Sequence, residues 1–317
     1  MNSAWFASWT THPGSLSWLL KKMEQVKSMT NSNQSGDASD VMKLSPEGFD
    51  RLARFVTGEL GIKMPNSKIS MMQARLVRRV KELDLRSIEQ YGEYLFSAGN
   101  KEERDHFINA ITTNKTDFFR ESEHFQYLTQ VALPSLQKNP GFDPTRMRAW
   151  SAACSSGEEP YTLGMVLGEY SRRQPQFDFE ILGTDVSTKV LHTAQRGVYA
   201  EELIDPVPLE MRRRYLLLST DPANRVVRIV PALRQKVSFH RLNFMDANYR
   251  IKERFDIIFL RNVLIYFDRP IQEAVVNRVC AHLKPGGYLF ISHSESLSEL
   301  NVPVKRVHTA VYRSSIQ

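Results

Sequence analysis

Residues 146–160 constrain the fold more than any other stretch of this 317-residue chain. They begin with an apolar run at 147–153 that has the composition of a buried parallel strand. A polar turn of small residues follows at 154–157, and the acids and proline at 158–160 are typical of the first turn of a helix. This strand–turn–helix order predicts the opening βα unit of a nucleotide-binding α/β domain.

The turn is not a dinucleotide fingerprint. Of the three glycines in G-x-G-x-x-G, only Gly157 is present. A pyrophosphate needs bare backbone amides at close approach, whereas a ligand without phosphates, such as S-adenosylmethionine, does not. The next predicted strand, 180–185, ends in Asp185, which could accept hydrogen bonds from both ribose hydroxyls. Asp185 could instead cap the following helix, a task that is also open to Ser187.

Composition bounds the class of protein. With 42% hydrophobic and 24% charged residues, the chain can bury a core, and its length favours two domains plus an appendage. Two cysteines argue against a disulfide framework and for a reducing compartment. Since no apolar run approaches the ~18 residues of a membrane span, we expect a cytoplasmic protein without membrane insertion. The net charge of +7 favours an acidic partner.

The organisation along the chain follows from these patterns. Residues 1–42 are expected to be a flexible extension, because most of their second half is polar. Helical periodicity without strands predicts an all-helical domain at 43–122, and alternating strands and helices predict a Rossmann-like domain at 123–317. Two short strands near 216–218 and 226–230, around a turn containing Pro222, predict a small antiparallel β-subdomain inserted at about 205–235.

The predicted helical domain carries a basic patch. Its first helix begins after Ser45 and stops at Gly61, and its second runs over about 67–83. The outer face of the second helix presents Arg75, Arg78 and Arg79, which form either a solvated face or a docking face. Two further helices begin after Ser87 and Asn100, and the pattern places Tyr91, Tyr94 and Leu95 inward.

The predicted α/β domain continues with further strands and helices. Helices are expected at 187–198 and 269–283, and a turn at 285–287. The remaining strands are expected at 237–244, 255–260 and 288–292, with a final edge strand at 307–312.

Polar side chains follow several of these strands. In an open α/β sheet ligands bind at the carboxyl ends of the strands, so Asp185, Asn243-Phe244 and Arg261-Asn262 are candidate ligand contacts, with Tyr266 one helical turn further on. Asn243 and Phe244 would flank an adenine, one by hydrogen bonding and one by packing. The polar loop at 112–121 either lines the same site or is a capped linker.

Four motifs, at residues 113–121, 150–161, 261–267 and 293–295, resemble those of the CheR-type chemotaxis receptor methyltransferases. The resemblance implies a protein-glutamate O-methyltransferase that uses S-adenosylmethionine, releases S-adenosylhomocysteine and requires no metal. It also implies that the following residues contact the cofactor: Asn114, Thr116, Arg120, Glu159, Asp185, Asn243, Phe244, Arg261 and Asn262.

The same resemblance implies the partner. A monomer would methylate the cytoplasmic domains of methyl-accepting chemoreceptors, docking their acidic helical bundle on the basic helix around Arg75, Arg78 and Arg79, with the β-subdomain as a second candidate contact. Relatives that tether a receptor peptide have a glycine-rich turn where this chain has residues 219–221, Ser-Thr-Asp, so peptide tethering is left open.

A mechanism follows as a hypothesis. A glutamate with a pKa of ~4.3 is already ionised near neutral pH, so methyl transfer requires no general base. The catalytic residues would be Arg120, for the methionyl carboxylate or for orienting the substrate, and Tyr266, for positioning by a hydrogen bond. Glu159 suits the cofactor's ammonium group. His293 and Glu295 would shape the rim of the pocket.

Two other functions compete with this one. A nucleic-acid methyltransferase would suit the positive charge, but amino-group methylation of bases commonly uses an Asn/Asp-Pro-Pro-aromatic turn, and this chain has no Pro-Pro. Aromatic residues are also not interleaved with the basic helix as stacking platforms. A non-catalytic module that senses the cofactor and binds receptors is the second alternative, and the presence of both Arg120 and Tyr266 argues against it.

Overall fold

The structure is a computed structural model that describes residues 42–97, 100–221 and 223–315. The predicted N-terminal extension therefore lies, except for Met42, outside the described residues, as does Pro222 of the predicted turn. Among the helices described, none is long and apolar enough to cross a lipid bilayer.

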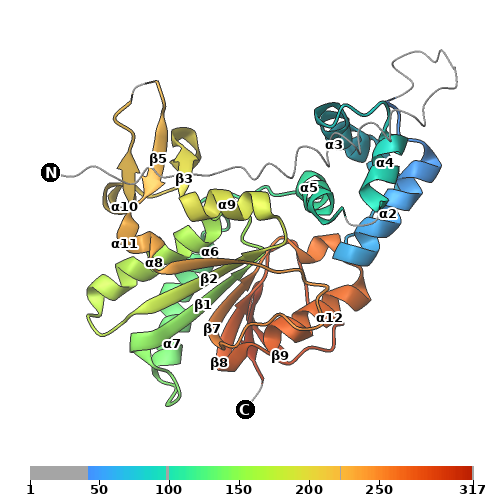
Figure 1. The fold of residues 1–317 in the computed structure, drawn as a ribbon. Coiled ribbons are helices and arrows are strands. Elements are labelled where there is room, and N and C mark those ends of the chain that lie inside the picture. Colours follow the sequence, from blue (N-terminus) through green and yellow to red (C-terminus); the bar gives the residue numbers. More distant parts are fainter. Residues whose placement is uncertain (1–41, 98–99, 222, 316–317) are drawn as a thin grey trace, which may run out of the picture. The chain divides into compact units, whose positions relative to one another are not determined.

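Four helices form the first part of the described chain (Figure 1). They are α2 (Pro46–Leu60), α3 (Ile69–Glu82), α4 (Ile88–Phe96) and α5 (Lys101–Ile111). Ser45 caps α2 by accepting a hydrogen bond from Gly48, and Gly61 ends it in the left-handed conformation at φ 70°. The prediction that Tyr94 points inward is wrong: it is 40% exposed, because α4 buries only a narrow stripe that includes Tyr91.

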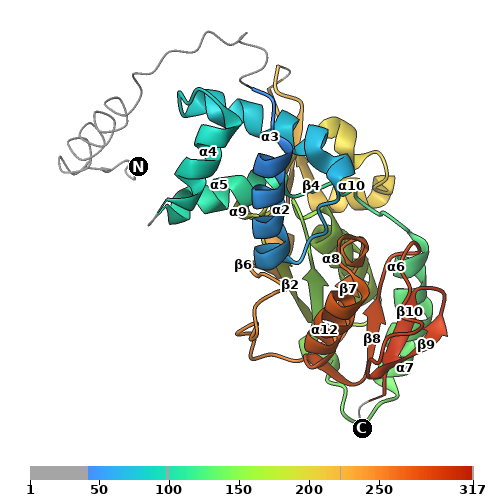
Figure 2. The ribbon, with the colours of Figure 1, turned by 90° about the vertical axis from the view of Figure 1, so that its right-hand side faces the viewer.

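A seven-stranded sheet organises the second part, in the order β6-β2-β1-β7-β8-β10-β9. The strands from β6 to β8 are parallel, whereas β10 runs antiparallel to β8 and β9 antiparallel to β10 (Figure 2). The bounds are β1 (Met147–Ala152), β2 (Phe179–Asp185), β6 (Val237–Arg241), β7 (Phe255–Leu260), β8 (Leu283–Phe290), β9 (Val304–His308) and β10 (Val311–Ser314).

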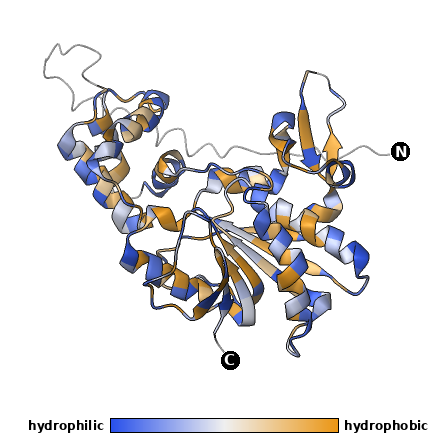
Figure 3. Ribbon diagram, turned by 180° about the vertical axis from the view of Figure 1, so that it is seen from behind, coloured by the Kyte–Doolittle hydropathy of each residue, from blue (hydrophilic) through white to orange (hydrophobic). Residues whose placement is uncertain are grey.

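Helices cover both faces of this sheet. One apolar cluster joins Ala149 and Ile257 to α8 (Glu158–Arg173) and to the segment α6 (Glu123–Tyr127), η2 (Leu128–Ala132) and α7 (Leu133–Gln137). The other joins Trp150 and Ile258 to α12 (Arg269–Cys280). Successive residues of a strand thus enter opposite layers, and the central strands β1 and β7 are buried along most of their length (Figure 3). This confirms the predicted Rossmann-like arrangement.

A small antiparallel sheet, in the order β3-β5-β4, confirms the predicted β-subdomain. It contains β3 (Val198–Ala200), β4 (Leu216–Leu218) and β5 (Val226–Ile229), and it adjoins α9 (Thr188–Arg196), α10 (Leu209–Tyr215) and α11 (Pro231–Arg234). The strand β3 was not predicted, because residue 198 was included in the preceding helix. Gly197 ends that helix at φ 58°, so the chain turns into β3 earlier than expected.

Short 3-10 helices complete the described chain: η1 (Asn66–Lys68), η3 (Pro144–Arg146), η4 (Glu201–Ile204) and η5 (Leu264–Tyr266). Three predictions near the C-terminal end need correction. The strand predicted to reach residue 244 ends at Arg241. The strand predicted at 307–312 is a hairpin, β9–β10, whose turn places Ala310 at φ 55°. The predicted turn at 285–287 is an irregularity within β8, where Gly286 has φ 70° and the pairing with β7 shifts.

Candidate cofactor-binding and active site

A cavity of about 460 Å³ opens where β1, β2, β6 and β7 end. Its volume lies within the range of small-molecule sites, roughly 300–1,000 Å³. The helical part contributes one wall, and the loops that follow the four strands contribute the rest. All the predicted cofactor-binding and catalytic residues line this cavity: Asn114, Thr116, Arg120, Glu159, Asp185, Asn243, Phe244, Arg261, Asn262 and Tyr266.

The turn after β1 depends on Gly157. Its φ is 98°, and a Cβ atom there would lie 2.8 Å from the Cβ atom of Ala194. A side chain is therefore excluded both by the backbone conformation and by the close approach of α9. Two residues earlier, the Ser155 hydroxyl donates to the carbonyl of Asn114 at 2.8 Å, which fixes the loop at 112–117 against this turn.

Asp185 connects the ends of two strands. One carboxylate oxygen accepts a hydrogen bond from the amide of Ser155, and the other accepts one from the amide of Ser187, each at 2.9 Å. Ser187 is the residue that caps α9, through the amide of Val190. Ser187, and not Asp185, therefore caps α9, and the Asp185 side chain lines the cavity. Burial raises the pKa of the Asp185 carboxyl above its ordinary value.

A buried cation lies between two carboxylates in the cavity. The Arg261 side chain is 2% exposed, and its Nε atom lies 3.4 Å from Glu159 Oε2 and 3.7 Å from Glu121 Oε2. The rings of Phe125 and Phe259 lie 5.6 and 5.7 Å from its guanidinium carbon. Arg261 is thus shared between two carboxylates, and Arg120 is a further cation that acts on Glu159. A cationic ligand group beside Glu159 would add to the stabilisation of its ionised form.

Glu159 is held from its other side. The hydroxyl of Ser151, on β1, donates to Glu159 Oε1 at 2.7 Å. Burial raises the pKa of the Glu159 carboxyl, and the neighbouring Arg261 opposes that rise. A cationic ligand group beside this carboxylate would oppose it further.

Glu295 holds the loop after β7. Its carboxylate accepts hydrogen bonds from the amides of Asn262, Leu264 and Ser292, at 3.2, 2.8 and 2.8 Å. Asn262 itself has φ 58°, a conformation that L-residues adopt uncommonly. Glu295 thus sets the backbone that presents both Asn262 and Tyr266 to the cavity, which is a more specific task than the predicted shaping of the rim.

Asn243 joins the two parts of the described chain. Its Nδ2 atom donates to the carbonyl of Glu59 at 2.7 Å, near the end of α2, and its Oδ1 atom accepts from the amide of Met245 at 3.0 Å. The predicted hydrogen bond to an adenine would therefore use the second Nδ2 hydrogen, the remaining lone pair of Oδ1 or the backbone.

One part of the cavity wall was not predicted from the sequence. Leu60, Ile62, Met64, Lys68 and Met71, from α2 to α3, all line the cavity. The apolar residues in the loop after Gly61 could have indicated this wall, but no motif links that loop to the cofactor site.

The three predicted basic-patch arginines have different partners. Arg75 donates to the carbonyls of Ile111 and Thr112 and so supports the C-terminal end of α5. Arg79 pairs through two hydrogen bonds, at 2.9 and 2.6 Å, with the buried Glu103. Arg78 is 85% exposed and pairs with Glu82 on the surface.

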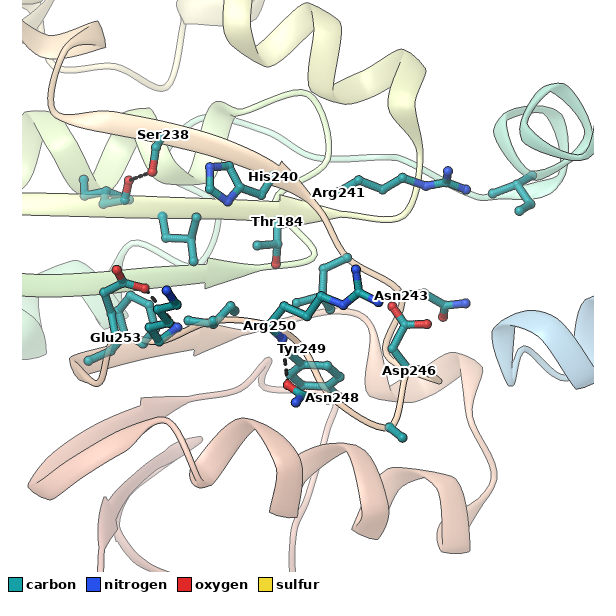
Figure 4. Close-up of a pocket in the computed structure, with 18 of the residues that line it drawn as sticks. Thr184, Ser238, His240, Arg241, Asn243, Asp246, Asn248, Tyr249, Arg250 and Glu253 are labelled. Atoms are coloured by element: carbon teal, nitrogen blue, oxygen red, sulfur yellow. Dashed lines mark hydrogen bonds between the residues drawn. The ribbon is translucent and has the colours of Figure 1, made fainter. Parts of the chain in front are cut away.

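A second, larger hollow of about 1360 Å³ lies beside β6. Figure 4 shows His240 and Arg241 on β6 above Thr184, with Tyr249 and Arg250 on the loop that faces them. Neither Glu159 nor Asp185 lines this hollow, so its wall lacks the carboxylates of the smaller cavity.

Family models match most of the chain. The model of the CheR methyltransferase all-alpha domain matches residues 47–112, and that of the CheR methyltransferase SAM binding domain matches residues 114–313. The chain belongs to the CheR methyltransferase family. This protein is therefore an S-adenosylmethionine-dependent methyltransferase, and the family membership predicted from the four motifs is confirmed.

Alignments with relatives cover most of this chain. It is 37% identical over 284 residues to a chemotaxis protein methyltransferase of Klebsiella aerogenes, covering 88% of this chain and 94% of the relative. It is 36% identical over 268 residues to chemotaxis protein methyltransferase 2 of Pseudomonas aeruginosa, covering 84% and 92%. It is 34% identical over 287 residues to a chemotaxis protein methyltransferase of Borreliella burgdorferi, covering 90% and 100%.

Proposed function

We propose that this protein methylates glutamate side chains on the cytoplasmic helices of chemoreceptors, forming glutamate methyl esters that serve adaptation in chemotaxis. The observation that carries the proposal is a single cavity that brings together Asp185, Glu159, Arg120 and Tyr266 from distant parts of the chain. The relatives named as chemotaxis protein methyltransferases support the choice of substrate.

The residues of the cavity fit S-adenosylmethionine. Asp185 offers a carboxylate to the ribose hydroxyls, and Phe244, which is buried, offers an apolar face for the adenine. Glu159, whose partner Arg261 is shared with Glu121, provides a carboxylate that suits an ammonium group. Bound there, the cofactor would supply an electrophilic methyl group on its sulfonium sulfur.

The protein's own contribution is orientation and exclusion of water. A glutamate carboxylate needs no proton removed near neutral pH. Tyr266 would position it by a hydrogen bond, and Arg120 would bind the cofactor's carboxylate or steer the substrate. A strong ion pair with the substrate would stabilise the ionised reactant more than a transition state in which charge is being neutralised, so it would slow the reaction. Arg120 therefore suits the cofactor's carboxylate better than the substrate's.

The basic helix α3 is the proposed docking surface for the acidic receptor helices. Arg78 is its best candidate contact, because it is exposed and has only a surface partner. Arg75 and Arg79 would contribute mainly by maintaining the fold around Thr112 and Glu103.

Mass spectrometry of receptor cytoplasmic domains, incubated with the protein and the cofactor, tests the proposal. The expected product is a mass increase of one methyl group on glutamates, lost as methanol in mild alkali. An alkali-stable methyl group would instead indicate N-methylation, and transfer to nucleic acid but not to receptors would reject the proposed substrate. If the cofactor binds but no methyl group is transferred to receptor domains, the non-catalytic alternative is favoured.

A further inference from the structure

A cluster of metal-ligating side chains, none of which lines the cavity, lies next to Arg261 of the cavity wall. Glu121, His124 and His293 each offer one possible ligand atom, and these atoms lie within 4.8 Å of one another. Glu121 and His124 flank the start of α6, and His293 follows β8, so the cluster joins segments that are far apart in the sequence.

His124 is the unusual member. It is 2% exposed, and neither ring nitrogen has a hydrogen-bond partner among the described residues. Buried polar groups without a partner are rare in folded proteins, because the lost hydration is not replaced, and a bound ion is one way to satisfy them. The Nδ1 atom faces Glu121 Oε2 at 3.4 Å, close to the separation of two ligands on one ion but long for a hydrogen bond.

The carboxylate is already oriented for such a task. The Ser292 hydroxyl donates to Glu121 Oε1 at 2.7 Å, which leaves Oε2 facing His124. Outer hydrogen bonds of this kind fix ligating carboxylates in metal sites. His293 completes the set from the solvent side: its ring centroid lies 4.7 Å from that of His124, and its exposed side chain offers a path of entry.

We infer that Glu121, His124 and His293 form a binding site for a single divalent transition-metal ion of the Zn²⁺ class. Two imidazoles and one carboxylate suit Zn²⁺ or Co²⁺ and not Mg²⁺, which prefers oxygen ligands. A water molecule would complete a tetrahedral shell. The ion is not part of the methyl-transfer reaction.

Occupation of this site reaches the cofactor pocket through Glu121. The Oε2 atom that would bind the ion is also the one that lies 3.7 Å from Arg261 Nε. An ion there withdraws one of the two carboxylates that neutralise Arg261, and adds positive charge beside a pocket for a cationic ligand. Zn²⁺ therefore lowers the affinity for S-adenosylhomocysteine, whose ammonium group is cationic, so the ion acts as an inhibitor.

Metal binding is measured on the full-length, tag-free protein by titrating Zn²⁺ against a chromophoric chelator. We expect one high-affinity equivalent per chain, weakened at least tenfold in His293→Gln. That variant changes an exposed side chain and should fold normally. The matched control is His240→Gln, an exposed histidine on β6 beside the other hollow (Figure 4), which should leave the affinity unchanged. Absence of saturable binding, or equal binding by His293→Gln, overturns the site.

Co²⁺ provides a structural readout. Tetrahedral Co²⁺ has intense visible absorption bands, which should appear in the wild-type protein and be absent in both His124→Gln and His293→Gln; octahedral-type weak bands would reject the proposed ligand set. Calorimetry with S-adenosylhomocysteine then tests the coupling: Zn²⁺ should reduce its affinity several-fold in the wild-type protein and not in His293→Gln. An equal affinity with and without Zn²⁺ in the wild-type protein would reject the inhibition.

Discussion

At the scale of single residues, the cavity gathers ionisable groups whose charges depend on their neighbours. Asp185 is the clearest case, because its carboxylate accepts two backbone hydrogen bonds and yet burial raises its pKa. An acid in this condition is adapted to bind donors that a ligand supplies, since each added donor stabilises the ionised form.

The affinity for S-adenosylhomocysteine should therefore fall as the pH is lowered through the raised pKa of Asp185. In the free protein the raised pKa lets Asp185 take up a proton at a higher pH than an exposed aspartate, and ribose hydroxyls would lower that pKa on binding. Binding then releases a proton, so affinity decreases as the pH falls through the raised pKa and is constant well above it. Calorimetry over a series of decreasing pH values, down to the limit at which the protein stays folded, measures this. An identical decline in Asp185→Asn would assign the effect to another group.

Tyr266→Phe tests the hydrogen bond proposed to position the substrate. Phenylalanine keeps the ring and removes the hydroxyl, so kcat should fall about 10- to 100-fold, equivalent to about 1.5–3 kcal/mol for a hydrogen bond to a charged group. The affinity for S-adenosylhomocysteine should stay the same. The matched control is Tyr94→Phe, an exposed tyrosine on α4. Full kcat in Tyr266→Phe would remove the proposed role.

At the scale of elements, one face of α3 packs against the other helices, and the opposite face is exposed to solvent. Arg79 pairs with Glu103, whose side chain is 3% exposed and also accepts a hydrogen bond from Tyr91 at 2.8 Å. Removing Arg79 leaves a buried carboxylate without its cation, a change that typically costs about 3–5 kcal/mol. Arg78 makes only a surface pair, worth a few tenths of a kcal/mol.

Charge reversal separates the two faces of α3. Arg78→Glu should raise the KM for the receptor domain at low salt, with kcat and thermal stability nearly unchanged, because docking loses charge complementarity. Arg79→Glu should lower the melting temperature strongly and is no test of docking. The control is Arg306→Glu on β9, a reversal at an exposed site outside α3. A KM for Arg78→Glu that equals the control's would move the docking surface elsewhere.

Elements were predictable where periodicity or capping is strong. The helices α2 and α3 and the strands β1, β2 and β7 followed from apolar spacing and from residues such as Ser45 and Gly61. The β9–β10 hairpin was missed because its turn has neither glycine nor asparagine, although Ala310 adopts a positive φ. The glycines near residue 286 indicate a turn in most sequences. Here Gly287 instead allows close approach, since a Cβ atom there would lie 2.8 Å from the carbonyl of Asp256.

Cavity residues were predictable where a motif placed them at the end of a strand, as for Asp185. The contact between Asn243 and the carbonyl of Glu59 was not predictable. It joins residues far apart in the sequence, and its acceptor is a backbone oxygen, which any residue type would supply. The same holds for the Glu121–His124–His293 cluster, whose members approach only after α6 and β8 have packed.

At the scale of the whole described chain, the cavity draws on both the helical part and the α/β part. Asn243 ties the loop after β6 to the end of α2. Asn109, on α5, ties that helix to the start of α9, where its Oδ1 atom accepts hydrogen bonds from the Ser187 hydroxyl at 2.8 Å and the Lys189 amide at 3.2 Å. A ligand in the cavity therefore contacts residues whose positions depend on both parts.

Saturating S-adenosylhomocysteine should stabilise both parts together. At a concentration 100 times its Kd, a ligand specific for the folded state adds about 2.7 kcal/mol. For a chain of this size, with an unfolding entropy of about 2.1 cal/mol/K per residue, that corresponds to a rise in Tm of roughly 4–5 °C. Calorimetry should show a single transition that moves as a whole, because Leu60 and Met71 of the helical part line the same cavity as Asp185. Asp185→Asn at the same ligand concentration should show a smaller rise, since its affinity is lower. Two transitions, of which only one responds to the ligand, would mean that the helical part does not contribute to binding.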